Sequence, residues 1–174
     1  MGDFWVFGYG SLIWRPGFTH TRTVRARIHG FRRALCVRSF VHRGTPERPG
    51  LVLGLDRGGS CIGLAFRVPG DLRDEVMAYL RERELVTHVY REKLLPISLP
   101  NGERAEAVSY VVDRRHGQYA GALHAEEAAA HVRGAVGQSG PNAEYVLNTV
   151  DHLKALGIRD HWLEDVARRL SEQR

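Results

Sequence analysis

The chain has 174 residues, of which 43% are hydrophobic and 26% charged, and this size and composition fit one soluble globular domain with a substantial core. Its formal charge of +5 comes from 25 basic residues scattered among 20 acidic ones, without a basic and aromatic stripe, so we expect no nucleic-acid partner. Neither an apolar stretch of membrane-spanning length nor a secretory signal pattern is found, so we expect a cytoplasmic protein with no membrane partner.

The first half of the chain has the patterns that are typical of β-strands. Apolar or alternating runs, separated by turns rich in glycine and proline, predict strands at residues 3–9, 23–30, 33–40, 50–55 and 61–68. Such strands would pair into a curved sheet or a barrel. Cys36 and Cys61 stand inside two of these runs, which favours buried thiols over a disulfide.

The second half of the chain is predicted to contain a helix, then two strands, and then only helices. Apolar residues at helical spacing predict a helix over 71–84, and strand signals return at 88–98 and 107–112. Further helices are predicted at 123–135, at 142–156 and from Asp160 onward. Strands followed by helices indicate an α+β fold class, and we expect a single domain over residues 1–174.

The stretch "WVFGYGSLIWRPGF" interrupts the first predicted strand with Gly8-Tyr9-Gly10. A dinucleotide fingerprint is not supported, because no third glycine stands at position 13 and Pro16 arrives before a helix could form. We predict a bend with positive φ at the two glycines, which would let backbone N–H groups approach a small anion. The alternative is a β-bulge or a strand-end turn that binds nothing.

The helical spacing of the predicted helix over 71–84 places its glutamates on two different faces. Glu75 and Glu82 fall on the solvated face, whereas Glu84 follows Leu80 by four residues and extends the apolar face. Burial would raise the pKa of Glu84 toward the range of a general acid or base. The alternatives are a helix that ends before Glu84, or a carboxylate that pairs with Arg83.

Other catalytic patterns are missing from the sequence. None of the 9 histidines stands in a metal-ligand spacing, so no metal site is predicted. The segment "YGSL" lacks the G-x-S-x-G pattern of a serine nucleophile.

Four stretches, in this order along the chain, closely resemble the ChaC-like γ-glutamylcyclotransferase family: "WVFGYGSLIWRPGF" (5–18), "HRGTPERPGLVLGL" (42–55), "YLRERE" (79–84) and "SGPNAEYVLNTVDHLKALGI" (139–158). The resemblance implies a γ-glutamylcyclotransferase-like fold, which is a small mixed β-barrel with flanking helices. It also implies cleavage of glutathione into 5-oxoproline and Cys-Gly without a cofactor.

The resemblance further implies roles for individual residues. Glu84 matches the family's catalytic glutamate, a general acid and base, and Tyr145 of the "N-x-E-Y" stretch is expected to close the pocket, the alternative being a core aromatic. The family commonly has a glycine before the tyrosine that follows this glutamate, where this chain has Val89 before Tyr90. The glycine turn that binds the γ-glutamyl part of the substrate falls on Val6, Phe7, Gly8, Tyr9, Gly10 and Ser11.

Two other functions stay open at this point. One is a related cyclotransferase that acts on other γ-glutamyl peptides or amines. The other is a non-catalytic, regulatory module of the same fold that binds a small molecule. Glu84 favours an enzyme, because a binding module needs no general acid or base.

Overall fold

A computed structural model of the protein describes residues 2–172, which form two compact units. The first unit contains Met1–Arg33 and Leu55–Asp113, and the second contains Ala34–Gly54 and Arg114–Arg174. Residues 1 and 173–174, at the ends of the predicted domain, lie outside the described part. The single domain over 1–174 therefore stays a prediction, and the two units are described separately.

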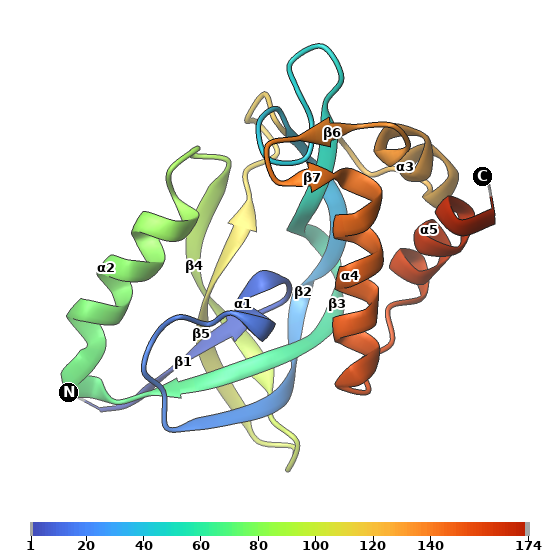
Figure 1. Ribbon diagram of the computed structural model, residues 1–174. Helices are drawn as coiled ribbons and strands as arrows, with labels where there is room; N and C mark the ends of the chain where they lie inside the picture. Colours follow the sequence, from blue (N-terminus) through green and yellow to red (C-terminus); the bar gives the residue numbers. More distant parts are fainter. Residues whose placement is uncertain (1, 173–174) are drawn as a thin grey trace. The chain divides into compact units, whose positions relative to one another are not determined.

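A closed barrel of five strands lies in the first unit, in the order β1-β3-β2-β4-β5 (Figure 1). Strand β1 pairs antiparallel with β3 and parallel with β5, so the barrel is mixed. The predicted α+β class and mixed β-barrel are thus confirmed. The strands are β1 (Phe4–Gly8), β2 (Arg22–Ser39), β3 (Gly50–Val68), β4 (Tyr90–Ser98) and β5 (Arg104–Val112).

Strands β2 and β3 are each longer than the sequence pattern predicts. The pattern divides each into two strands, whereas the structure has continuous strands of 18 and 19 residues. Gly30 inside β2 has φ 87° and Gly58 inside β3 has φ 103°. Each glycine bends its strand without ending it, because a residue without Cβ adopts these values readily. Both strands continue from the first unit into the second.

The helix α2 (Arg73–Glu84) packs on the barrel of the first unit, and a 3₁₀ turn, η1 (Gly70–Leu72), precedes it. The helix predicted over 71–84 is therefore confirmed. Val76, Met77 and Leu80 are buried in one apolar cluster with Val6 of β1 and Tyr110 of β5. This contact holds the middle of α2 against the barrel.

The second unit contains three helices and a two-stranded sheet. Helix α5 (His161–Glu172) contacts both α3 (Ala125–Val132) and α4 (Asn142–Ala155), as Figure 1 shows in orange and red. The three predicted helices are confirmed. The sheet of β6 (Val136–Gly137) and β7 (Gly140–Pro141) is not predicted from the sequence, because strands of two residues carry no period.

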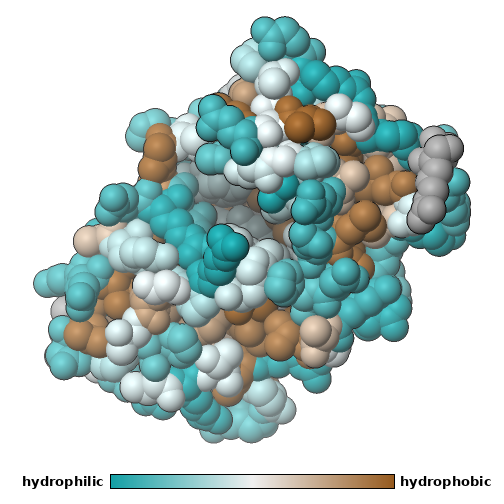
Figure 2. Space-filling model, in the orientation of Figure 1, coloured by the Kyte–Doolittle hydropathy of each residue, from teal (hydrophilic) through white to brown (hydrophobic). Residues whose placement is uncertain are grey.

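Hydrophilic side chains cover most of the face in Figure 2, and the hydrophobic ones form smaller, separate patches. Many charged residues on the surface stand in pairs of opposite sign, among them Arg67–Asp3, Arg91–Asp113 and Arg159–Glu164. Cys36 and Cys61 are buried thiols that form no disulfide, as predicted. Among residues 2–172, no helix is both long and apolar enough to cross a membrane.

Candidate active site

The glycine turn, residues 6–11, overlaps the end of strand β1 and reaches the first residue of a single turn of helix, α1 (Ser11–Trp14). The Ile13 N–H donates to the Gly10 carbonyl at 2.9 Å, and the Arg15 N–H donates to the Ser11 carbonyl at 2.8 Å. The prediction that no helix forms before Pro16 is wrong. One helical turn fits because its donors all precede Pro16, which has no N–H to continue it.

The two glycines of the turn do not have the predicted positive φ. Gly10 has φ −140°, and Gly8 also lies outside the left-handed region. A Cβ on Gly8 would lie 3.0 Å from the Leu12 Cβ and 3.3 Å from the Phe66 ring. Gly8 therefore lets strand β1 and helix α1 approach each other closely, a role within the fold.

A buried arginine holds the backbone of the turn in place. Arg33 is 5% exposed, and its Nε donates to the Tyr9 carbonyl at 2.6 Å while its Nη2 donates to the Ile62 carbonyl at 2.6 Å. Charge-assisted hydrogen bonds to buried carbonyls are strong, so the turn has little freedom at Tyr9. Arg33 is not among the residues predicted for the site, although it directly precedes the apolar run Ala34–Val37, which is buried.

Glu84 is the last residue of α2, and its side chain is only 16% exposed. Burial raises the pKa of this carboxyl, and the positive charge of Arg83 partly opposes the shift. Glu75 and Glu82 are exposed, as the helical spacing predicts. The helix does not end before Glu84, but the other alternative holds in part, because Arg83 Nε lies 3.6 Å from Glu84 Oε1.

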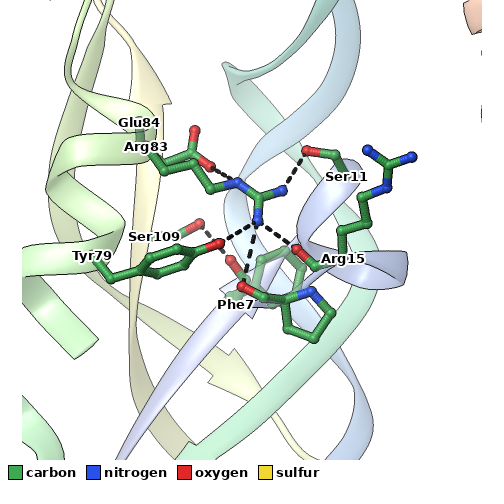
Figure 3. A network of polar contacts seen from close by, with 8 residues as sticks. Phe7, Ser11, Arg15, Tyr79, Arg83, Glu84 and Ser109 are labelled. Atoms are coloured by element: carbon green, nitrogen blue, oxygen red, sulfur yellow. Dashed lines mark hydrogen bonds and ion pairs between the residues drawn. The ribbon is translucent and has the colours of Figure 1, made fainter. Parts of the chain in front are cut away.

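The Arg83 guanidinium links α2 to the segment that follows the glycine turn (Figure 3). Its Nη2 donates to the Ser11 Oγ at 2.9 Å, and its Nη1 donates to the Tyr79 hydroxyl at 3.0 Å. Nη1 also donates to the carbonyls of Arg15 and Pro16. Ser11 and Glu84, both predicted site residues, thus contact one guanidinium group.

Strand β4 carries a second carboxylate, Glu92, in the neighbourhood of Glu84. Arg81 donates to both carboxylate oxygens of Glu92 at 3.0 Å, and the Tyr110 hydroxyl donates to Oε1 at 3.0 Å. These hydrogen bonds, Arg81 first, lower the pKa of Glu92. Burial, together with the charges of Glu92 and Glu84, raises the pKa of Tyr110. Tyr110, 1% exposed, therefore remains a hydrogen-bond donor at neutral pH.

Tyr145 lies on α4 in the second unit, whereas Glu84 and the glycine turn lie in the first. Its hydroxyl accepts a hydrogen bond from the Leu53 N–H at 3.0 Å, and the Arg43 guanidinium lies 5.4 Å from the centre of its ring. These contacts attach α4 to strand β3 within the second unit. The predicted role of Tyr145 in closing the pocket stays a prediction.

A cavity of about 290 Å³ in the first unit does not contain the candidate residues. Its lining includes Asp3 just before β1, Trp5 near the start of β1 and Arg104 at the start of β5, whereas the glycine turn lies at the other end of β1. No group of three or more His, Cys, Asp or Glu within residues 2–172 could hold a metal ion. The candidate chemistry therefore rests on Glu84 and its neighbours.

Comparison with known protein families places the chain in one of them. Residues 4–173 match the family described as ChaC-like protein. The chain belongs to the ChaC-like family. The match covers both units described above and includes Glu84 and the glycine turn.

Two proteins with sequences similar to this chain have names that state an activity. The chain is 33% identical over 165 residues to the glutathione-specific gamma-glutamylcyclotransferase of Escherichia coli, covering 95% of this chain and 71% of that protein. It is 32% identical over 171 residues to gamma-glutamylcyclotransferase 2-3 of Arabidopsis thaliana, covering 94% of this chain and 86% of that protein.

The fold is similar to that of a solved structure, a gamma-glutamyl cyclotransferase specific to glutathione from yeast. The TM-score is 0.86 with 24% sequence identity, over 100% of this chain and 98% of the other. The predicted γ-glutamylcyclotransferase-like fold is thus confirmed.

Proposed function

We propose that this protein is a γ-glutamylcyclotransferase that cleaves glutathione into 5-oxoproline and Cys-Gly. One observation carries the proposal: Glu84, a partly buried carboxyl with a raised pKa, and Ser11 of the glycine turn both contact the Arg83 guanidinium. The relatives named above, whose names state this activity or its class, support it over most of the chain. No cofactor is needed, because the substrate contains both reacting groups.

The reaction is an internal acyl transfer. The α-amino nitrogen of the γ-glutamyl residue attacks its own γ-carbonyl carbon, so a C–N bond forms and closes the five-membered lactam. The C–N bond to the cysteinyl nitrogen then breaks, and Cys-Gly leaves without consumption of water. The enzyme has to hold the folded-back conformer and move protons, and correct orientation alone accelerates such reactions greatly.

Glu84 is proposed to move the proton. A free α-amino group has a pKa of about 8, so at neutral pH it arrives protonated and must lose a proton to attack. Glu84 accepts that proton and returns it to the departing cysteinyl nitrogen. A carboxyl with a raised pKa suits both steps, whereas Glu92, whose pKa is lowered, stays ionised.

The glycine turn is proposed to bind the γ-glutamyl part of glutathione. Backbone N–H groups of the turn are suited to stabilise the tetrahedral oxyanion or to hold the α-carboxylate. Arg33 supports this proposal, because its hydrogen bond to the Tyr9 carbonyl fixes the backbone before substrate arrives. Val6, Phe7, Gly8, Tyr9, Gly10 and Ser11 form this proposed binding segment, and Tyr145 is the proposed side chain that closes the pocket.

Product analysis tests the proposed reaction directly. Purified protein is incubated with glutathione in ¹⁸O-labelled water, and the products are identified by mass spectrometry. We expect 5-oxoproline and Cys-Gly in equal amounts, with no label in the new lactam. Labelled glutamate would indicate hydrolysis and would contradict the cyclotransferase mechanism.

The same assay separates glutathione from other substrates. A γ-glutamyl dipeptide without cysteine and a γ-glutamylamine are incubated in parallel, and we expect kcat/KM to be highest for glutathione. A higher value for either alternative would assign the protein to a different cyclotransferase. Absence of product from all three would favour the non-catalytic binding module.

A further inference from the structure

The position of the Arg83 side chain suggests a role that the proposed reaction does not itself require. Arg83 is 22% exposed and lies beside Glu84, yet its hydrogen bonds reach the other way, to Ser11 and to the carbonyls of Arg15 and Pro16. These partners are separated from Arg83 by 67 to 72 residues along the chain. One side chain therefore connects two distant segments of the proposed site.

We infer that Arg83 is a positioning residue, which holds the segment from Gly10 to Gly17 against the end of α2 and so sets the distance between the bound γ-glutamyl group and Glu84. This inference rests on the proposed function, because it assigns the substrate to the glycine turn. Helix α1 has only four residues, and a helix so short is not stable without contacts from outside. Arg83 provides such contacts.

The geometry requires a guanidinium group. Nη1 of Arg83 donates to the Tyr79 hydroxyl and to the carbonyls of Arg15 and Pro16. Nη2 donates in another direction, to the Ser11 Oγ (Figure 3). A guanidinium has five donors in a rigid plane, whereas the lysine ammonium is a single centre on a flexible stem. Lysine at this position would keep the positive charge but could not reach both Ser11 and the carbonyls.

Arg83 also adjusts the charge balance at Glu84. Its guanidinium opposes the effect of burial on the pKa of that carboxyl. Other polar and charged groups near this end of α2 include Tyr79, Arg81 and Glu82 of the same helix, Glu92 of β4 and Tyr110 of β5. Among these, Arg81 is engaged with Glu92 through both carboxylate oxygens. Arg83 forms the ion pair with Glu84, at 3.6 Å from Nε to Oε1.

Two substitutions separate position from charge. Arg83→Lys keeps the positive charge but loses the planar set of guanidinium donors. We therefore expect kcat/KM for glutathione to fall about 10- to 100-fold, while the acid limb of its pH profile stays in place. Arg83→Gln loses the charge and the guanidinium donors, so we expect kcat/KM to fall at least as far. We also expect the acid limb to move to higher pH, because Glu84 binds its proton more tightly without the neighbouring positive charge. Arg73→Lys is the matched control on the same helix, where the guanidinium lies over the Phe4 ring, and it should change neither quantity.

Kinetics per folded molecule decide between positioning and a purely structural role. The inference is overturned if both variants keep the wild-type kcat/KM. It is also overturned if activity falls only in proportion to the folded fraction and the acid limb of Arg83→Gln stays in place. If Arg83→Gln does not fold, Arg83→Lys carries the comparison, and a wild-type kcat/KM in that variant overturns the inference.

Hydrogen exchange separates this inference from the proposed function. Wild-type protein that releases no 5-oxoproline would refute the proposed function, but the contact between Arg83 and the segment from Gly10 to Gly17 can still be tested. We expect backbone amides of that segment to exchange at least about 10-fold faster in Arg83→Lys than in the wild type and in Arg73→Lys. Unchanged exchange would show that Arg83 does not hold the segment.

Discussion

Glu84 and Glu92 lie on neighbouring elements, and their surroundings shift their pKa values in opposite directions. Burial raises the pKa of Glu84, whereas hydrogen bonds from Arg81 and Tyr110 lower that of Glu92. Two carboxyls whose pKa values differ in this way can take different tasks in one site. We propose that Glu84 exchanges the proton, whereas Glu92 accepts a hydrogen bond from the Tyr110 hydroxyl.

The raised pKa of Glu84 predicts a cost in stability at neutral pH. The folded state holds the Glu84 proton more tightly than the unfolded state, so stability decreases as pH rises above the ordinary pKa of about 4.5 toward the raised value. Glu84→Gln carries no charge to bury. We expect its melting temperature to exceed that of the wild type at pH 7 and the difference to vanish near pH 4. A lower melting temperature for Glu84→Gln at pH 7 would contradict the burial of a charged carboxylate.

The glycine turn and helix α1 form one short element in which the two glycines serve different purposes. Gly8 permits close packing against Leu12 and Phe66, whereas Gly10 stands where strand β1 has ended and α1 begins. A substitution at Gly8 should therefore affect the fold, and one at Gly10 should affect the proposed binding of the γ-glutamyl group.

Gly10→Val tests whether the turn binds substrate. A β-branched side chain at this buried position would displace the backbone donors, and a displacement of about 1 Å can lower the rate about 100-fold. We expect glutathione cleavage to fall much further than thermal stability does. Gly8→Ala is the comparison, and we expect it to destabilise the protein by about 1–3 kcal/mol through overpacking against Leu12. Normal turnover in Gly10→Val would show that the turn serves the fold alone.

The loop between α2 and β4 contains the only non-glycine residue with positive φ among residues 2–172, His88 at 62°. It lies one residue before Val89, which is 1% exposed. A β-branched residue is unfavourable in this region, so His88→Val should destabilise the protein by about 1–2 kcal/mol in urea denaturation. Thr87→Val, also exposed, is the control and should have little effect. Equal stability of the two variants would contradict the left-handed conformation of His88.

At the scale of the whole molecule, the absence of a nucleic-acid partner stays a prediction, which rests on the scatter of the 25 basic residues among 20 acidic ones. Arginines that would form a basic surface are engaged with acidic residues, among them Arg81 with Glu92 and Arg168 and Arg169 with Asp165. A protein that neutralises several phosphates loses about 10³-fold or more in affinity between 50 and 200 mM salt. In gel-shift titrations we expect no tight complex at physiological salt. A sequence-selective, nanomolar complex under those conditions would contradict this interpretation.

Local features of the site could be predicted from the sequence, and long-range contacts could not. The burial of Glu84 follows from its spacing to Leu80, because helix phase is a local property. The contacts of Arg83 with Ser11, and of Arg33 with Tyr9, join segments far apart in the chain and depend on how the strands pair. The continuity of β2 through Gly30 was missed for a related reason, since strand pairing overrides the preference of glycine for turns.

The central claim, that Glu84 transfers the proton in glutathione cyclisation, is tested most directly by the turnover of Glu84→Gln. Wild type, Glu84→Gln and Glu82→Gln are assayed for release of 5-oxoproline from glutathione at saturating substrate, with the folded fraction measured for each. The amide is nearly isosteric but accepts no proton, so we expect kcat to fall about 10²- to 10⁴-fold in Glu84→Gln and to stay near wild type in the exposed Glu82→Gln. Retention of more than about a tenth of wild-type turnover by Glu84→Gln would contradict the account.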